Sequence, residues 1–292
     1  MKQRPIYVLT ENKESENTLM LKSRSLNIRE KNGICYITFP SLDKAGVKNA
    51  FTTRIGGVST GIYSSMNMSF SRGDNKDAVI ENYRRICDVL GTDYRRCVLS
   101  KQTHTTNVRI VTESDAGKGI IKDRDFDDTD GLVTNVPGIT LVTQFADCTG
   151  LLFYDPVKKV IAASHAGWRG TAGEIGRVTV LKMEIEFGCN PSDIRAGIAP
   201  SIGPCCFEVD DPVIEQFEKI KSYDVSKVIK NDGNGKYHVD LWNANLLSLL
   251  SAGLKEENIS VTDICTKCNS DMFFSHRVTG FERGNLAALI CL

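Results

Sequence analysis

The sequence predicts an α+β protein with mixed α/β layers, in which mixed β-sheets are flanked by helices. Short apolar runs rich in Val, Ile and Phe recur along the chain and have the length of strands. Other segments have the apolar spacing of helices. The two kinds of segment interleave without strict alternation, which favours mixed sheets over a regular repeat of strand and helix.

The expected strands lie mostly in the middle of the chain. They begin at Gly33, Cys97, Asn107, Ile139, Gly150, Val160 and Ile194. The first ends at Pro40 and follows residues 1–32, which are polar enough to form an ordered edge or a loosely held arm. The strands that begin at Gly150 and Val160 are joined by a turn at Asp155-Pro156 and should lie side by side.

Helices are expected where periodic segments have recognisable ends. Residues 77–90 and residues 172–187 are each followed by a glycine that can end a helix, Gly91 and Gly188. Another helical segment follows Asp210. Asp240 can cap the start of a helix that closes before Gly253.

Composition excludes several classes of protein. We expect residues 45–292 to form a single catalytic domain after an N-terminal arm and first strand at residues 1–44, because no linker or repeat interrupts the chain. The 36 basic and 36 acidic residues give no net charge and no basic cluster, so a nucleic-acid partner is not expected. The chain has no apolar run of membrane length and no signal peptide, so we expect a cytoplasmic monomer or homodimer without a membrane partner. The ten cysteines then indicate reduced thiols.

Three short stretches place possible zinc ligands next to apolar runs: T-H-T at 103–105, A-D-C at 146–148 and S-H-A-G-W-R-G at 164–170. His104, Cys148 and His165 match the three protein ligands of a catalytic zinc site, which keeps a fourth position open. A single histidine or cysteine beside a strand is more often structural, so the argument rests on the three together. We expect His104 to come from a third strand, next to the two that carry Cys148 and His165.

The stretch after His165 predicts a tight turn into a helix. Gly167, Gly170 and Gly173 allow that turn and leave backbone N–H groups at the helix start, where an anion can bind. Arg169 would reinforce such a site. The alternative is that Arg169 is a surface arginine near a turn.

Several ordered motifs resemble the YfiH family, whose members are labelled multicopper polyphenol oxidases, laccase-domain proteins or purine nucleoside phosphorylases. The resemblance covers residues 45–292. It rests on FTTRIGGVSTGIYSSMNMS at 51–69, GDNKDAVIENYRR at 73–85, KQTHTTNV at 101–108, DGLVTNVPGITLVTQFADCTGLLFYDP at 130–156, HAGWRGTAGEI at 165–175, GIAPSIGPCCFEVD at 197–210 and CTKCNSDMFFSHR at 265–277. It implies a YfiH/CNF-like fold of the cysteine-hydrolase type, and it places the family's zinc ligands on His104, Cys148 and His165.

The chain departs from the family pattern in three places. Thr105 follows His104 where the family has Gly or Ser, and the arginine-rich segment near the C-terminus reads HRVTGFERGNLAAL. Arg277 and Arg283 are the arginines left there. Residues 122–131 form an acidic segment before the family's aspartate position, Asp130, and we expect its carboxylates to be solvated.

The resemblance implies purine nucleoside chemistry, with nucleosides and phosphate as partners. It implies phosphorolysis of adenosine, inosine or methylthioadenosine, and deamination of adenosine by a zinc-bound water. Asp147 is the local candidate for an acid/base, and a structural role for it is equally open. The residues proposed to contact substrate or phosphate are Arg54, Arg169, Asn67 and Gln102. Copper is not expected as a multicopper cluster, because such clusters use roughly ten histidines and the chain has 4.

Two other functions stay open. In a cysteine- or zinc-dependent amidohydrolase that edits a peptidoglycan precursor, Cys148 would be a nucleophile with His165 or His104 as its base. A non-catalytic zinc or redox protein could be built on the C-x-x-C pair Cys265 and Cys268 with the adjacent pair Cys205 and Cys206. We expect the adjacent pair not to match the geometry of a second C-x-x-C pair.

Overall fold

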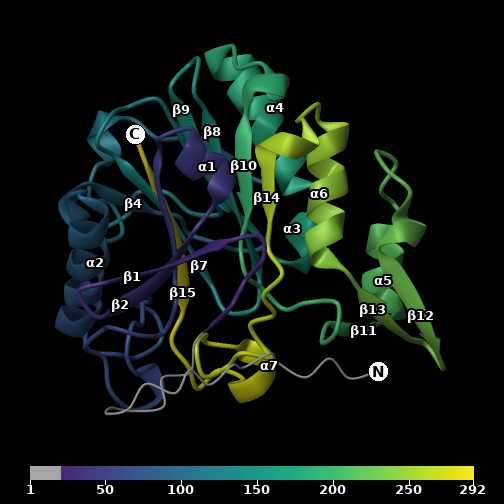
Figure 1. Ribbon diagram of the computed structural model, residues 1–292, viewed down its shortest axis with the longest axis horizontal. Helices are drawn as coiled ribbons and strands as arrows, with labels where there is room; N and C mark the ends of the chain where they lie inside the picture. Colours follow the sequence, from purple (N-terminus) through teal and green to yellow (C-terminus); the bar gives the residue numbers. More distant parts are fainter. Residues whose placement is uncertain (1–20) are drawn as a thin grey trace.

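Two six-stranded sheets packed face to face form the centre of the molecule (Figure 1). The computed structural model describes residues 21–292, so most of the predicted N-terminal arm lies outside the described residues. The first sheet has the spatial order β1 (Asn27–Lys31), β2 (Ile34–Thr38), β3 (Lys48–Thr52), β15 (Leu286–Cys291), β7 (Thr140–Phe145) and β4 (Cys97–Leu99). Only the pairing of β4 with β7 is parallel in this sheet.

The second sheet contains the strands that carry most of the predicted site. Its spatial order is β14 (Ile259–Val261), β10 (Arg195–Ile198), β8 (Thr149–Asp155), β9 (Val160–Ala166), β6 (Gly131–Thr134) and β5 (Val108–Ile110). The outer pairs, β14 with β10 and β5 with β6, are parallel, and the three inner pairs are antiparallel. The mixed sheets and the flanking helices confirm the predicted α+β class.

The main hydrophobic core lies between the two sheets. Phe51, Phe145 and Ile290 from the first sheet pack in one buried cluster with Leu152 and Ala163 from the second. Burial of apolar surface of this kind stabilises a fold by about 25 cal/mol per Å². The contact between β7 and β9 also brings the strand before Cys148 close to the strand that carries His165.

Helices cover the outer faces of both sheets. Helix α2 (Lys76–Leu90) packs on the first sheet, and α4 (Ile175–Phe187) and α6 (Leu241–Ser251) pack on the second (Figure 1). The shorter helices are α1 (Pro40–Lys44), α3 (Trp168–Ala172), α5 (Asp211–Phe217) and α7 (His276–Thr279). The layers therefore run helix, sheet, sheet, helix.

A smaller sheet lies to one side of these layers (Figure 1). It has the order β11 (Glu208–Asp210), β13 (Lys236–Val239) and β12 (Ile229–Gly233). Together with α5 it forms a separate hydrophobic cluster, against which Trp168 of α3 packs. This arrangement places the small sheet beside the turn that follows His165.

The predicted helix ends are confirmed, with one exception. Gly91 and Gly188 follow α2 and α4 in the left-handed conformation, and the Asp240 carboxylate accepts a hydrogen bond at the start of α6. The helix predicted for residues 172–187 is wrong at its start. Glu174 has a φ of 55°, which breaks the segment into α3 and α4.

The predicted strands are present, but the run from Cys97 is shorter than expected. It ends at Leu99, and the chain then leaves the sheet. Eight strands were not expected: β1, β3, β6, β14 and β15 of the two large sheets, and all three strands of the small sheet, β11, β12 and β13. Among the residues from 21 onward, no helix is long and apolar enough to cross a membrane.

Gly197 of β10 lies against Phe39, and we expect Gly197→Ala to destabilise the fold. A Cβ at this position would lie 2.5 Å from the fully buried Phe39 ring. Overpacking of a core costs about 1–3 kcal/mol. Urea unfolding followed by circular dichroism measures this loss.

The variant Phe39→Leu supplies the control. If the ring is the obstacle, Gly197→Ala costs less in the Phe39→Leu background than in the wild type. Equal costs in the two backgrounds would place the strain elsewhere.

Candidate metal centre and active site

A β-hairpin and one loop bring the three predicted metal ligands together. Cys148 directly precedes β8, and His165 lies in β9 opposite Gly150 of the antiparallel pair. His104 comes from the loop between β4 and β5, where its φ of 68° turns the chain sharply. The prediction that His104 belongs to a strand is therefore wrong, because β4 ends before it.

The three side chains point toward one another. The Cys148 Sγ lies 4.0 Å from the His104 Nε2. The rings of His104 and His165 are edge to face, with centroids 4.8 Å apart. One ligand atom from each residue lies within 4.8 Å of the others. These three residues together offer the number of protein ligands that a catalytic zinc site takes.

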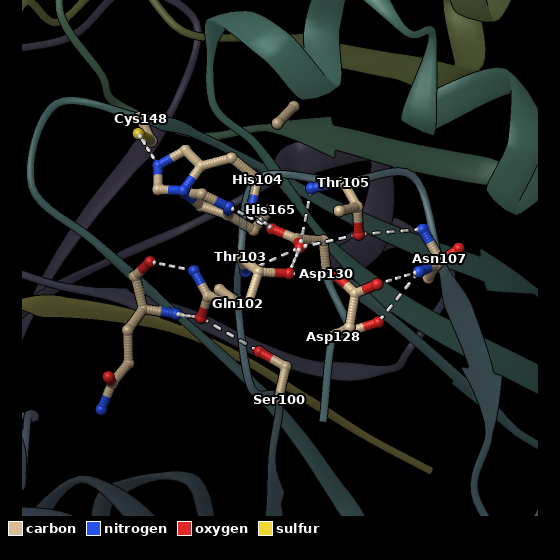
Figure 2. A network of polar contacts seen from close by, with 12 residues as sticks. Ser100, Gln102, Thr103, His104, Thr105, Asn107, Asp128, Asp130, Cys148 and His165 are labelled. Atoms are coloured by element: carbon tan, nitrogen blue, oxygen red, sulfur yellow. Dashed lines mark hydrogen bonds and ion pairs between the residues drawn. The ribbon is translucent and has the colours of Figure 1, made fainter. Parts of the chain in front are cut away.

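A buried carboxylate, Asp130, organises this set (Figure 2). It lies 2.8 Å from the Nδ1 of His165. It also accepts hydrogen bonds from the backbone N–H groups of the 103–105 loop, at 2.9–3.1 Å. One side chain therefore fixes both the ring of His165 and the turn that presents His104.

The expectation that the carboxylates of residues 122–131 are solvated is wrong for Asp130, whose side chain is fully buried. Burial opposes its ionisation, but the hydrogen bonds from His165 and from the backbone of Thr105 and Thr103 outweigh this and lower its pKa to about 2. An ionised Asp130 only accepts hydrogen bonds, so the Nδ1 of His165 must be the donor. The Nε2 of His165 is then left for a metal ion.

Gly167 leaves the space that the set needs. A Cβ at this position would lie 2.8 Å from the His104 ring, 3.2 Å from the Cys148 Sγ and 3.4 Å from the His165 ring. Its φ of −58° is open to any residue, so the requirement for glycine here is one of space. The turn into α3 thus forms a wall of the site from backbone alone.

Cys148 and His165 form a charged pair. Burial opposes ionisation of Cys148, but the charge of His165 and hydrogen bonds with both histidines lower the pKa of the thiol to about 6. Burial likewise opposes the charge of His165, but the Cys148 charge and the hydrogen bond with Asp130 raise its pKa to about 9. At neutral pH the metal-free site therefore holds a thiolate beside an imidazolium.

These residues fit a zinc ion. With bonds of about 2.0–2.3 Å, a tetrahedral zinc places nitrogen and sulfur ligands about 3.3–3.6 Å apart. The observed separation of 4.0 Å between Sγ and Nε2 needs only a small side-chain adjustment to reach this value. Two imidazoles and a thiolate are donors that zinc accepts, and the carboxylate behind His165 is a common support for such a ligand.

The set opens into a cavity of about 500 Å³, the size of pocket that takes a small ligand. Trp168 and Phe207 provide aromatic surface in its lining, and Glu208 provides a carboxylate. Arg169 and Arg277 line it as well, with the guanidinium of Arg169 stacked 4.1 Å from the Trp168 ring. Aromatic faces and paired cations together suit a ligand with a flat base and an anionic group.

Comparison with known proteins identifies the family of this chain. Residues 48–292 match the family model described as multi-copper polyphenol oxidoreductase laccase. The chain belongs to this family. The resemblance to YfiH-type proteins is thereby confirmed.

Two relatives carry names that state an activity. The purine nucleoside phosphorylase YlmD of Bacillus subtilis strain 168 is 38% identical over 246 residues, which cover 82% of this chain and 86% of the relative. The adenosine deaminase RL5 from an unknown prokaryotic organism is 34% identical over 237 residues, covering 80% of this chain and 90% of the relative.

A solved structure shares the fold. The crystal structure of the hypothetical protein YfiH of Bacillus licheniformis superposes with a TM-score of 0.85 at 34% identity, covering 91% of this chain and 98% of that one. The laccase-family fold and its layers of mixed sheets and helices are thus shared between the two proteins.

Of the residues predicted to contact substrate or phosphate, the structure brings only Arg169 into the cavity with the metal set. Arg54 lines a second, smaller cavity of about 180 Å³. Its guanidinium donates to the carbonyl oxygens of Ser64 and Ser270 and stacks 4.7 Å from the Phe274 ring. Arg283 lines that second cavity too.

Asn67 and Gln102 have protein partners instead. Asn67 is fully buried and bonds to Ser69, Asp74 and the backbone of Asn285. Gln102 exchanges two hydrogen bonds with the backbone of Gln144. These hydrogen bonds tie Asn67 and Gln102 to neighbouring segments of the chain. Their contact with a substrate stays a prediction.

Asp147 lines the cavity, but its carboxylate is occupied. It accepts hydrogen bonds from the hydroxyl groups of Thr266 and Ser275 and from the backbone of Arg277, at 2.6–2.9 Å. The contacts fix the residue beside Cys148, in a backbone with a φ of 79°.

Sequence reasoning missed Asp130 as a site residue. One signal was present: it is a carboxylate directly before the apolar run Gly131–Thr134, which forms the buried strand β6. A charged group at the start of a buried strand needs partners, which the 103–105 loop and His165 supply.

We expect Asp130→Asn to weaken zinc binding at the His104–Cys148–His165 set by about 10–100-fold. The amide cannot accept from all the groups that now donate to the carboxylate. The free zinc concentration that half-protects Cys148 from iodoacetamide measures the affinity at this set alone.

Asp128→Asn is the matched control. Asp128 bonds the Thr103 hydroxyl and the Asn107 amide of the same loop without contacting His165. Equal zinc affinities of Asp130→Asn and Asp128→Asn would contradict the role of Asp130.

In metal-free protein, we expect alkylation of Cys148 to rise with pH and to be half-maximal near pH 6, because the thiolate is the reactive form. His165→Gln removes the stabilising charge and moves this midpoint upward. Peptide mapping by mass spectrometry follows each cysteine separately.

Cys35 serves as the internal control. Burial raises its pKa, so it should react only at higher pH. A Cys148 that reacts over the same pH range as Cys35 would contradict the charged pair.

Proposed function

We propose that this protein is a zinc-dependent purine nucleoside phosphorylase that also deaminates adenosine. The observation that carries the proposal is a His–Cys–His set that opens into a cavity lined by aromatic and basic side chains. The names of two relatives, a purine nucleoside phosphorylase and an adenosine deaminase, agree with it.

His104, Cys148 and His165 would hold the zinc ion. When bound there, it would polarise a substrate atom or lower the pKa of a water molecule. The family description names copper. With 4 histidines in the chain, this protein lacks the imidazoles for a multicopper cluster.

The nucleoside base would lie against the aromatic surface of the cavity. Trp168 and Phe207 offer faces on which a purine can stack. Arg277 lies over Phe207, with its guanidinium 5.6 Å from the ring. A base stacked against Phe207 would thus lie next to the Arg277 guanidinium.

Arg169 and Arg277 would bind phosphate. In phosphorolysis a phosphate oxygen forms a bond to C1′ of the ribose while the bond from C1′ to N9 breaks, and the purine leaves with a proton. Two guanidinium groups at the cavity stabilise the anion and place it for attack. His276 also lines the cavity and is the group we propose as proton donor.

Deamination needs a group that moves a proton from the attacking water to the departing ammonia. Asp147 is the candidate that the sequence offers, but its three hydrogen bonds make it a positioning residue in our proposal. Among residues 21–292, no hydrogen bond or ion pair involves the Glu208 side chain, and this cavity-lining carboxylate is the one we propose for proton transfer.

A specific observation also favours a second function, a cysteine-dependent amidohydrolase. Cys148, His165 and Asp130 have the order of a nucleophile, its base and the group that orients the base. The peptidoglycan precursor is the substrate to test. If this is the function, activity survives zinc removal and is lost when Cys148 is alkylated.

The ten cysteines, all unpaired in the structure, fit a reducing compartment, and we propose that the protein works in the cytoplasm as one catalytic domain.

With adenosine as substrate, we expect adenine and ribose 1-phosphate only when phosphate is present, and inosine with or without it. Cys148→Ala should lose zinc from the set and both activities, whereas Cys35→Ala should retain them. Chromatography of the products together with zinc analysis tests this. A wild type with zinc in the set and neither product would sink the proposal.

Arg169→Ala tests phosphate binding within the same assay. We expect a KM for phosphate raised about tenfold or more, as for the loss of a charge-assisted bond of about 1.5–3 kcal/mol. Arg177→Ala, an exposed arginine of α4 outside the cavity lining, is the matched control.

A further inference from the structure

A second group of sulfur atoms converges beside the cavity. We call it the four-cysteine cluster: Cys205, Cys206, Cys265 and Cys268. The first two lie in the connection from β10 to β11, and the last two in the connection from β14 to α7. Two segments far apart in the sequence thus meet at this point, where an isolated bridge also joins Ser201 to Cys265.

We propose that the four-cysteine cluster binds a structural zinc ion that holds one wall of the cavity in place. This site is separate in its residues from the His104–Cys148–His165 set and does not depend on the proposed enzymatic function.

The sulfur positions match a single tetrahedral ion. Zinc–thiolate bonds of about 2.3 Å give a tetrahedron with edges of about 3.8 Å. The Sγ of Cys268 lies 3.7 Å from that of Cys205 and 3.4 Å from that of Cys206, and Cys205 and Cys206 are 3.7 Å apart. All four sulfurs lie within 4.8 Å of one another.

Other states of the sulfurs fit less well. A disulfide needs about 2.05 Å between sulfurs, and all four cysteines are free. In a [4Fe–4S] cluster each thiolate binds a different iron, which spreads the sulfurs more widely than around a single ion. Tetrahedral sulfur sites for one ion favour zinc.

The surroundings also fit a metal site. The backbone N–H of Gly203 donates to the Sγ of Cys265 at 3.2 Å, a hydrogen bond that favours a thiolate. Cys265 is buried, whereas Cys205 and Cys268 are exposed, so an ion can enter from the surface. Four protein ligands leave no open position, which indicates a structural rather than a catalytic ion.

The expectation that the adjacent pair could not match a second C-x-x-C pair is therefore wrong. Residues 204–206 form a turn in the structure. Side chains of neighbouring residues point to opposite faces only in an extended strand. In the turn, the Sγ atoms of Cys205 and Cys206 both approach that of Cys268.

The two segments joined by the cluster build the cavity. Phe207 and Glu208 follow the first pair directly and line it. Thr266, between the second pair, donates to the Asp147 carboxylate beside Cys148. The Arg277 guanidinium donates to the carbonyl oxygen of Cys206 at 3.3 Å. An ion in the cluster would cross-link these parts of the wall.

Zinc content per chain tests the proposal on the purified full-length protein. We expect two zinc ions in the wild type and in Cys35→Ser. The double variant Cys205→Ser/Cys268→Ser should lose one, and Cys148→Ser should lose the other. X-ray absorption of Cys148→Ser should show zinc with sulfur ligands only, at about 2.3 Å.

The outcomes of this experiment distinguish a failure of the four-cysteine site from a failure of the proposed function. A wild type with one zinc that is lost in Cys205→Ser/Cys268→Ser supports the four-cysteine site and removes the zinc from the active-site proposal. One zinc that is lost only in Cys148→Ser overturns the four-cysteine site. So does iron, or a disulfide among the four cysteines, in protein purified under reducing conditions.

A second measurement covers the case that the double variant does not fold. In Cys148→Ser, zinc should protect the four cysteines from iodoacetamide, and a chelator should expose them together and lower the melting temperature. Alkylation of Cys205 and Cys268 at equal rates with and without the chelator overturns the proposal.

Discussion

The site depends on one buried carboxylate. Asp130 directly precedes β6. Its carboxylate accepts hydrogen bonds from backbone N–H groups of the 103–105 loop and from the His165 ring. Its own carbonyl oxygen accepts from the backbone of His165 at 2.7 Å. Burying a charge is costly unless donors replace the lost water, and here the donors come from two elements that must meet for the site to exist. The carboxylate therefore links the folding of the loop to the geometry of the ligands.

Much of the fold and the central part of the site follow from local patterns in the sequence. Cys148 and His165 are adjacent in space because apolar runs and a turn at Asp155-Pro156 define a hairpin, and hairpin register follows from such patterns. The ends of α2 and α4 follow from glycines that can adopt a positive φ. These features depend on residues close together in the chain, which is why a single sequence carries them.

The parts that the sequence did not predict depend on distant contacts. Arg54 stands in a glycine-rich turn, as a phosphate ligand would, but the carbonyl oxygens that hold it come from residues 64 and 270. Strand β15 reads as a short apolar run with two alanines, which periodicity alone cannot distinguish from a helical segment. Asp130 is one of several acids in a polar segment, and its place directly before the apolar run of β6 does not by itself identify the His165 ring and the 103–105 loop as its partners.

The position of β15 has a consequence for the order in which the molecule assembles during synthesis. This strand lies between β3 and β7, so Ala288 pairs with Phe51 on one side and Thr143 on the other. Until residues 286–291 have been made, the first sheet consists of two halves with open edges facing each other, and the main core lacks Leu286, Ala288 and Ile290. Contacts of such long sequence separation form slowly, and open edges invite pairing with other chains. A nascent chain of this protein would therefore need its edges protected until the last strand is in place.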